Sequence, residues 1–122
     1  MKGNCVMRFE GISREFSLVG EGQYDTIGAF WDELEAIYGL ENLCGLGYRW
    51  DGDVISYAIG LKNGLIDGCN LSIDLPDEGW TAVKGKTEEL KQIYDEIYKS
   101  GRLRYEIETF FDDGSCEIKY CR

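Results

Sequence analysis

The C-terminal segment, residues 103–121, constrains the fold more than any other stretch, because two alternating runs flank one tight-turn dipeptide. Asp113-Gly114 supplies the positive φ angles that a two-residue hairpin turn needs. With that turn length, Glu108 would pair with Lys119. Because side chains alternate between the faces of a strand, one face would be largely apolar and the other largely charged. The charged face would hold Glu106, Glu108, Phe110, Glu117 and Lys119, and the apolar face Tyr105, Ile107, Thr109, Phe111, Cys116, Ile118 and Tyr120.

A second hairpin is predicted around Asp51-Gly52, the same dipeptide between two further alternating runs. A two-residue turn there would set Leu46 opposite Tyr57. We expect the face with small residues to admit a bulky helix, and the tyrosine-bearing face to lie across the sheet from that helix. The small face would consist of Gly45, Gly47, Ser56, Ala58 and Gly60, and the larger face would include Leu46, Tyr48, Ile55 and Tyr57.

Two segments have apolar residues at intervals of three and four, which is typical of amphipathic helices. The first helix is predicted from Asp25 or Thr26 to Gly39, and the second from Thr87 to Gly101. Aspartate and threonine cap helix starts, and glycine ends helices. The predicted apolar stripes are Ile27, Phe30, Trp31, Leu34, Ile37 and Tyr38, then Leu90, Ile93, Tyr94, Ile97 and Tyr98. Further strands are expected over residues 4–9, 13–19, 71–75 and 80–84, with a loop over 62–70.

The two halves of the chain show the same succession of strand, helix, strand, Asp-Gly turn and strand. The predicted helix caps lie 61 positions apart and the turns 62 positions apart, so a two-fold internal repeat is the simplest account. We therefore predict a single α+β domain over residues 1–122, with repeats at about 13–61 and 80–121. The repeats would form an antiparallel sheet with both helices on one face. The opposite faces of the two halves would meet around a shared concavity.

Charge and residue types exclude several classes of function. With 23 acidic and 13 basic residues, the net charge of −10 repels phosphate backbones and favours cationic ligands, so we expect no direct nucleic-acid partner. The absence of histidine excludes Ser-His and Cys-His catalytic pairs. The cysteines are odd in number and form no Cys-x-x-Cys motif, which predicts reduced thiols, no metal and a cytoplasmic location. Without a long apolar run, no membrane partner is expected, and no residue pattern calls for a cofactor. The five cysteines are Cys5, Cys44, Cys69, Cys116 and Cys121, of which the last two are expected to be inert buried thiols.

Three segments carry a family resemblance: YAIG (57–60), LPDEGWTAVKGKTEELKQIYDEIY (75–98), and IETF followed by EIKY (107–120). Their order and spacing resemble the gyrase-inhibitor-like small-molecule-binding domain, which is also the effector-binding module of multidrug-responsive bacterial transcription activators. The resemblance covers about residues 13–121. It implies two strand-helix-strand-strand repeats with a ligand groove at their pseudo-two-fold axis.

In that family, aromatic side chains in the groove stack on flat, often cationic, organic molecules, and a buried glutamate supplies the counter-charge. The resemblance places the glutamate at Glu108, with Phe110 where the motif has tyrosine. The choice between Glu108 and Glu106 stays open, because both lie on one face of the predicted strand. Lys119, predicted opposite Glu108, could neutralise the acid. The predicted ligand-binding residues are Glu108, Tyr57, Trp80, Tyr48, Phe110 and Trp31, the last being a core residue in the alternative interpretation.

We expect a free-standing binding module that takes a hydrophobic, aromatic or cationic small molecule into the groove between the repeats. One alternative is a hydrolase of strained cyclopropane-type electrophiles, with Glu108 orienting water and Tyr57 acting as the acid. The other is a protein inhibitor of the gyrase type, whose acidic surface binds a protein partner. Whether the protein is a monomer or a homodimer stays open.

Overall fold

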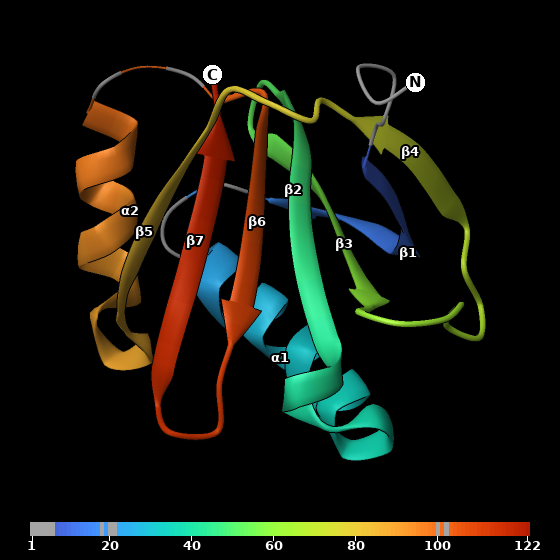
Figure 1. Ribbon diagram of the computed structural model, residues 1–122. Helices are drawn as coiled ribbons and strands as arrows, with labels where there is room; N and C mark the ends of the chain where they lie inside the picture. Colours follow the sequence, from blue (N-terminus) through green and yellow to red (C-terminus); the bar gives the residue numbers. More distant parts are fainter. Residues whose placement is uncertain (1–6, 18, 20–21, 100, 102) are drawn as a thin grey trace.

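The computed structural model describes residues 7–17, 19, 22–99, 101 and 103–122, which form one antiparallel sheet and two α-helices (Figure 1). This confirms the predicted α+β class. The strands are β1 (Met7–Ser17), β2 (Leu43–Asp51), β3 (Val54–Leu61), β4 (Leu71–Leu75), β5 (Trp80–Lys86), β6 (Tyr105–Phe110) and β7 (Ser115–Cys121). The helices are α1 (Gly22–Tyr38) and α2 (Leu90–Lys99), accompanied by the short 3-10 turns η2 (Leu40–Asn42) and η3 (Thr87–Glu89).

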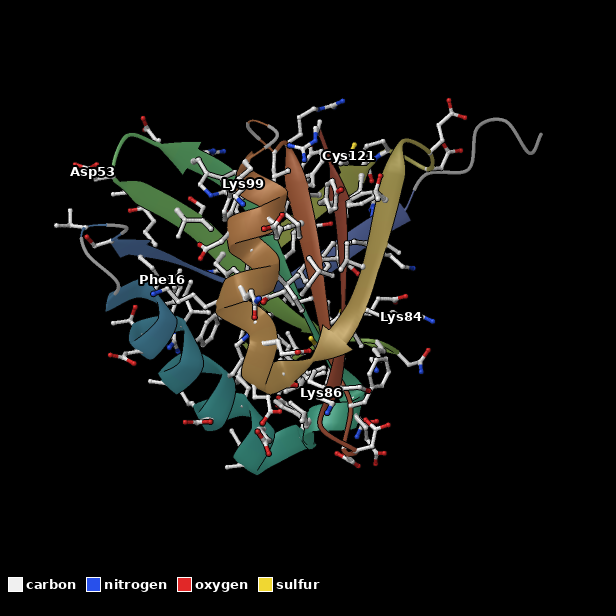
Figure 2. The ribbon with its side chains drawn as sticks, turned by 90° about the vertical axis from the view of Figure 1, so that its left-hand side faces the viewer. Phe16, Asp53, Lys84, Lys86, Lys99 and Cys121 are labelled. Atoms are coloured by element: carbon white, nitrogen blue, oxygen red, sulfur yellow. The ribbon has the colours of Figure 1, made fainter. Side chains whose placement is uncertain are left out.

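The strands lie in the order β4-β1-β3-β2-β6-β7-β5, and each neighbouring pair is antiparallel. The N-terminal and C-terminal halves of the chain therefore meet where β2 pairs with β6. The sheet is curled (Figure 1), and both helices lie on the same side of it (Figure 2). This arrangement agrees with the predicted placement of the helices.

The helices begin and end close to the predicted capping residues. Gly39 ends α1 with a φ of 87°, and its N–H donates to the Glu35 carbonyl at 2.9 Å. α1 begins at Gly22, before the predicted start at Asp25 or Thr26, whereas η3 begins at Thr87 and leads into α2 as predicted. Neither of the described helices is long and apolar enough to cross a membrane.

One continuous strand, β1, replaces the two strands predicted over residues 4–9 and 13–19. It pairs with β4 through residues 7–11 and with β3 through residues 12–17. The break in the sequence pattern reflects a change of the buried face, because Phe9 packs in the smaller core cluster and Ile12 and Phe16 pack against the larger one on the other side of the sheet. The predicted strand residues 4–6 and 18, together with Cys5, lie outside the described residues.

The turn of the C-terminal hairpin is longer than predicted. The Phe111 N–H donates to the Ser115 carbonyl at 2.9 Å, so three residues, 112–114, form the turn. Gly114 takes a φ of 88°, and the Asp113 side chain accepts the Ser115 N–H at 2.9 Å. A three-residue turn with glycine in the left-handed conformation is a common hairpin connection, and it shifts the register by one position.

This shift overturns the predicted pairing of Glu108 with Lys119. Glu108 pairs with Ile118, and Lys119 pairs with Ile107. Because adjacent residues of a strand point to opposite faces, the Glu108 and Lys119 side chains lie on opposite faces of the sheet. The face that carries Glu108 also carries Glu106, Phe110, Cys116, Ile118 and Tyr120.

The hairpin of β2 and β3 also differs from the prediction. Its turn residues are Gly52 and Asp53, with Gly52 at a φ of 60°. The register also shifts between Gly47 and Arg49, which leaves Tyr48 as an extra residue in β2. Such a bulge changes which residues of the two strands share a face.

The predicted faces of this hairpin are therefore wrong. Gly47 pairs with Tyr57, and Leu46 pairs with Ala58 rather than with Tyr57. Tyr57 consequently shares the helix face with Gly45 and Gly47, and Leu46 and Ala58 lie on the other face. The two glycines do admit bulky groups, as expected, but Tyr57 is one of those groups.

The larger core cluster lies between the sheet and the helices, and a smaller one lies on the other face. The acid-bearing face of β6 belongs to the helix side, so the concavity predicted on the opposite face does not hold Glu108. The larger cluster contains Phe30, Trp31, Leu34, Leu43, Ile55, Tyr57, Ile59, Ile66, Phe110 and Cys116, and the smaller one contains Phe9, Leu46, Ala58 and Leu75.

Replacing Gly45 by alanine should lower the free energy of unfolding by about 1–3 kcal/mol, the usual cost of overpacking a core. A Cβ at this position would lie 2.7 Å from Cζ2 of Trp31 and would also overlap the Tyr57 hydroxyl. Both rings are buried and are hydrogen-bonded to each other, so neither can move away without losing contacts. Urea denaturation followed by circular dichroism measures the change.

Gly28→Ala is the matched control, because no atom lies within 4 Å of a Cβ at that helical position. Alanine there should raise the free energy of unfolding by about 0.5–1 kcal/mol. Unchanged stability of the Gly45 variant would contradict the assigned packing of Tyr57 and Trp31.

Candidate functional site

A cavity of about 580 Å³ lies between the helix face of the sheet and the two helices. Figure 2 looks towards this face, with α1 and α2 in front of the strands. The cavity contains no lysine or arginine among its described lining residues. Its aromatic walls are Trp31, Trp50, Tyr57, Tyr94, Tyr98 and Phe110. Its acidic residues are Asp32, Glu35, Glu106 and Glu108.

The floor of the cavity is the junction of β2 and β6, where each buried acid faces a glycine. Gly45 pairs with Glu108, and Gly47 pairs with Glu106. A Cβ at Gly47 would lie 2.8 Å from Oε1 of Glu106, so a larger residue would collide with the carboxylate. Gly47 therefore leaves the space that Glu106 occupies, and Gly45 leaves the space that Tyr57 and Trp31 occupy beside Glu108.

Glu108 ends a buried chain of hydrogen bonds. Its side chain is 5% exposed, and its Oε1 accepts a hydrogen bond from the Tyr57 hydroxyl. That hydroxyl in turn accepts the Trp31 indole N–H at 2.9 Å. The Trp31 ring packs edge-on against Phe110, with 4.8 Å between ring centroids. The structure thus brings together four of the residues predicted for the ligand site. They are Trp31 from α1, Tyr57 from β3, and Glu108 and Phe110 from β6.

Glu106 is the second buried acid of the cavity, at 3% exposure. It accepts a hydrogen bond from the Tyr98 hydroxyl, with 3.1 Å between that oxygen and Oε2. The geometry does not choose between Glu106 and Glu108 as the ligand-binding acid, because both acids line the cavity. They lie two residues apart on β6 and therefore point to the same face.

Tyr94 places a third hydroxyl in the cavity wall. The residue is 5% exposed, and its hydroxyl has no partner at hydrogen-bonding geometry within the described part of the chain. It still lies close enough to Glu108 to lower the pKa of that acid. The ring stacks on that of Tyr98, with centroids 5.7 Å apart. A buried polar group without a partner is unfavourable unless water or a ligand supplies one.

The electrostatics of the cavity favour neutral acids. Burial raises the pKa of Glu106 well above its ordinary value, the nearby charge of Glu108 raises it further, and the hydrogen bond from Tyr98 lowers it. Burial also raises the pKa of Glu108, opposed by the hydroxyls of Tyr57 and Tyr94. The pKa of each of these two tyrosines rises well above the usual range, mainly through burial, so both stay protonated.

Two residues predicted for the ligand site, Tyr48 and Trp80, lie outside the cavity, in the cluster on the other face of the sheet. The Tyr48 hydroxyl lies 2.6 Å from the Ser13 hydroxyl. The Trp80 indole donates to the Pro76 carbonyl at 2.8 Å, and its ring lies 6.3 Å from that of Tyr105. The bulge in β2 and the register of the hairpins account for the difference.

Tyr94, Tyr98 and Trp50 line the cavity but were not predicted as site residues. The signal for the tyrosines was present, because both belong to the apolar stripe of α2 and lie one helical turn apart. Hydroxyls on a stripe that faces a sheet need buried partners, and two acids on the facing strand could provide them. Trp50 gave no comparable signal, because its position depends on the bulge.

The Cys116 thiol is not an activated nucleophile. Burial raises the pKa of the Cys116 thiol, the reverse of what a reactive cysteine needs. The described residues contain no group of three or more histidine, cysteine, aspartate or glutamate side chains placed to hold a metal ion. What the cavity offers is aromatic surface with two acids at its floor.

Comparisons of the chain with protein-family models, with curated proteins and with solved structures find no match.

The buried acids should make the protein more stable as the pH falls from neutral towards the ordinary glutamate pKa of 4.5. The pKa values of Glu106 and Glu108 are raised above the ordinary 4.5 in the folded state, so folding binds protons over this range. Their contribution is fully present below the unfolded value and is lost as the pH rises through the folded values. Thermal melts at a series of pH values measure the slope.

The double variant Glu106→Gln/Glu108→Gln should have a flatter dependence of melting temperature on pH. Glu117→Gln, on the other face of the same hairpin, should keep the wild-type slope. If the double variant also keeps that slope, the two acids are not the groups that titrate.

Proposed function

We propose that this protein is a non-enzymatic binding module that takes a flat, hydrophobic, cationic organic molecule into the cavity between the sheet, α1 and α2. The observation that carries the proposal is Glu108, a carboxylate buried among aromatic rings in a cavity with no basic residue among its described lining residues. Lys119, which could have neutralised it, lies on the other face of the sheet.

The physical basis is the cost of burying an unpaired carboxylate. An ionised acid without a counter-charge is unfavourable in an apolar environment, and an organic cation offsets that cost. The same cation gains from the faces of aromatic rings, here Trp31 and Tyr57 beside Glu108. The cavity volume of about 580 Å³ falls within the range usual for small-molecule sites.

The order of the strands supports a repeated, gyrase-inhibitor-like organisation as part of this proposal. Apart from β4, the strands of the two halves lie in the orders β1-β3-β2 and β6-β7-β5. If β1, β2 and β3 are matched with β5, β6 and β7, the second half repeats the order of the first in reverse. The proposed ligand site then lies beside the junction of the halves. The described cysteines, Cys44, Cys69, Cys116 and Cys121, are all free, which supports a reducing location such as the cytoplasm.

Tryptophan fluorescence tests the proposal, because Trp31 and Trp50 line the cavity. We expect the protein to bind N-methylacridinium more tightly than acridine, its neutral analogue, after inner-filter correction. Glu108→Gln should weaken binding of the cation by about tenfold or more, since it removes a charge-assisted interaction, and should leave acridine within about threefold.

Lys119→Gln is the matched control, because it changes a charge on the same hairpin but on the other face. Its affinity for the cation should equal that of the wild type. Equal binding of cation and neutral analogue, or no effect of Glu108→Gln, would contradict the role of this acid. If neither compound binds, a protein partner for the acidic surface becomes the better explanation.

One observation favours a hydrolase as the second candidate: Tyr57 donates directly to Glu108, and Lys119 does not compete for the acid. Glu108 would take a proton from water while the water oxygen bonds to a carbon of a strained cyclopropane ring. The ring C–C bond would break, and Tyr57 would protonate the carbon or the conjugated oxygen that receives the electron pair. Proton transfer from Glu108 to Tyr57 would then restore both groups.

Incubation with a cyclopropane-bearing electrophile, followed by chromatography and mass spectrometry, tests this candidate. Turnover should give a product one water heavier than the substrate, and Tyr57→Phe should abolish it because phenylalanine cannot donate the proton. Tyr38→Phe, on a tyrosine of α1 that is not among the residues lining the cavity, is the control. The candidate fails if the product forms at the rate seen without protein.

A further inference from the structure

Building on the function proposed above, we infer that the preferred ligand is a flat aromatic dication with a protonated N–H group at each end, held jointly by Glu106 and Glu108. The single acid Glu108 does not determine the number of charges on the ligand. The positions of the two acids, the partners of each acid and the Tyr94 hydroxyl beside them do.

The two acids offer separate anchoring points. They are two residues apart on β6, so their Cα atoms are about 7 Å apart on one face. Glu108 accepts a hydrogen bond from Tyr57 on β3, and Glu106 accepts one from Tyr98 on α2. Because each carboxylate is oriented by a hydroxyl from a different element, the pair presents two acceptors rather than one shared site.

The hydroxyl of Tyr94 is the independent sign of a ligand. It is buried in the cavity wall, and although it lies near Glu108, it has no partner at hydrogen-bonding geometry among the residues that the structure describes. The hydroxyl oxygen can accept a hydrogen bond from an N–H group. A protonated amine or amidine near Glu108 supplies that partner, whereas a quaternary ammonium group, which has no N–H, does not.

The surrounding charges do not compensate the second acid. The groups that line the cavity or influence the two acids are acidic or neutral, so a monocation that pairs with one carboxylate leaves the other without a counter-charge. These groups are Asp32 and Glu35 from α1, Tyr57 from β3, Tyr94 and Tyr98 from α2, and Cys116 from β7.

The number of protons released on binding is a second measurement that distinguishes a dication from a monocation. In the empty cavity, burial and mutual repulsion favour protonated acids. A bound cation favours the ionised form, so a dication should displace more protons than a monocation does. Its affinity should therefore rise more steeply with pH.

Isothermal titration calorimetry with benzene-1,4-dicarboxamidine and 4-methylbenzamidine tests the inference, because the two share a ring and differ by one charge. Titrations in two buffers of different ionisation enthalpy give the number of protons released. We expect the wild type to bind the diamidine at least about tenfold more tightly and to release more protons with it. Glu106→Gln or Glu108→Gln alone should reduce the affinity ratio to about threefold or less.

Glutamine is nearly the same size as glutamate, and circular dichroism establishes that each variant is folded. Glu117→Gln, on the other face of the hairpin, should keep the wild-type ratio. The inference is overturned if the wild type binds the two amidines with affinities within about threefold of each other. It is also overturned if both single variants keep a tenfold preference for the diamidine. In either case, binding of 4-methylbenzamidine would still support the proposed cation site. If neither amidine nor N-methylacridinium binds, the proposed function fails together with the inference.

Discussion

The pairing of two glycines with two glutamates across the β2–β6 junction is the constraint on which the cavity depends. Gly45 and Gly47 contribute no side chains to the helix face, so the middle of the sheet lacks the apolar residues that usually cover it. Tyr57 lies across the space above Gly45 and reaches Glu108, and Trp31 reaches Tyr57 from α1. The helices thus cover a polar floor inside an otherwise apolar layer.

This arrangement lowers stability at the place where it creates the cavity. Two acids with raised pKa values are buried side by side, and a third polar group, the Tyr94 hydroxyl, is left without a described partner. The aromatic and aliphatic cluster around them offsets that cost through ordinary burial. Clusters of buried polar groups with shifted pKa values are typical of functional sites.

Much of the fold could be predicted from the sequence, because helices, strands and turn positions follow from local periodicity and from glycine. The pairing register could not, since one extra turn residue at 112–114 and one bulge at Tyr48 exchange whole faces. Glu108 and Phe110 were grouped correctly because residues of one strand keep their relative orientation in any register. Tyr48 and Trp80 were not, because their faces depend on pairing with other strands.

The three-residue turn of the last hairpin links the conformation of an exposed tip to the chemistry of a buried surface. If the hairpin instead formed the two-residue Asp113-Gly114 turn with the chain length unchanged, β7 would shift by one position against β6, which would bring Lys119 beneath the helices and turn Ile118 outwards. Glu106 and Glu108 would then share their face of the sheet with the ammonium group of Lys119. Substitutions at this exposed tip that change the preferred turn are therefore a route by which evolution can change the polarity of the cavity without altering any residue in it.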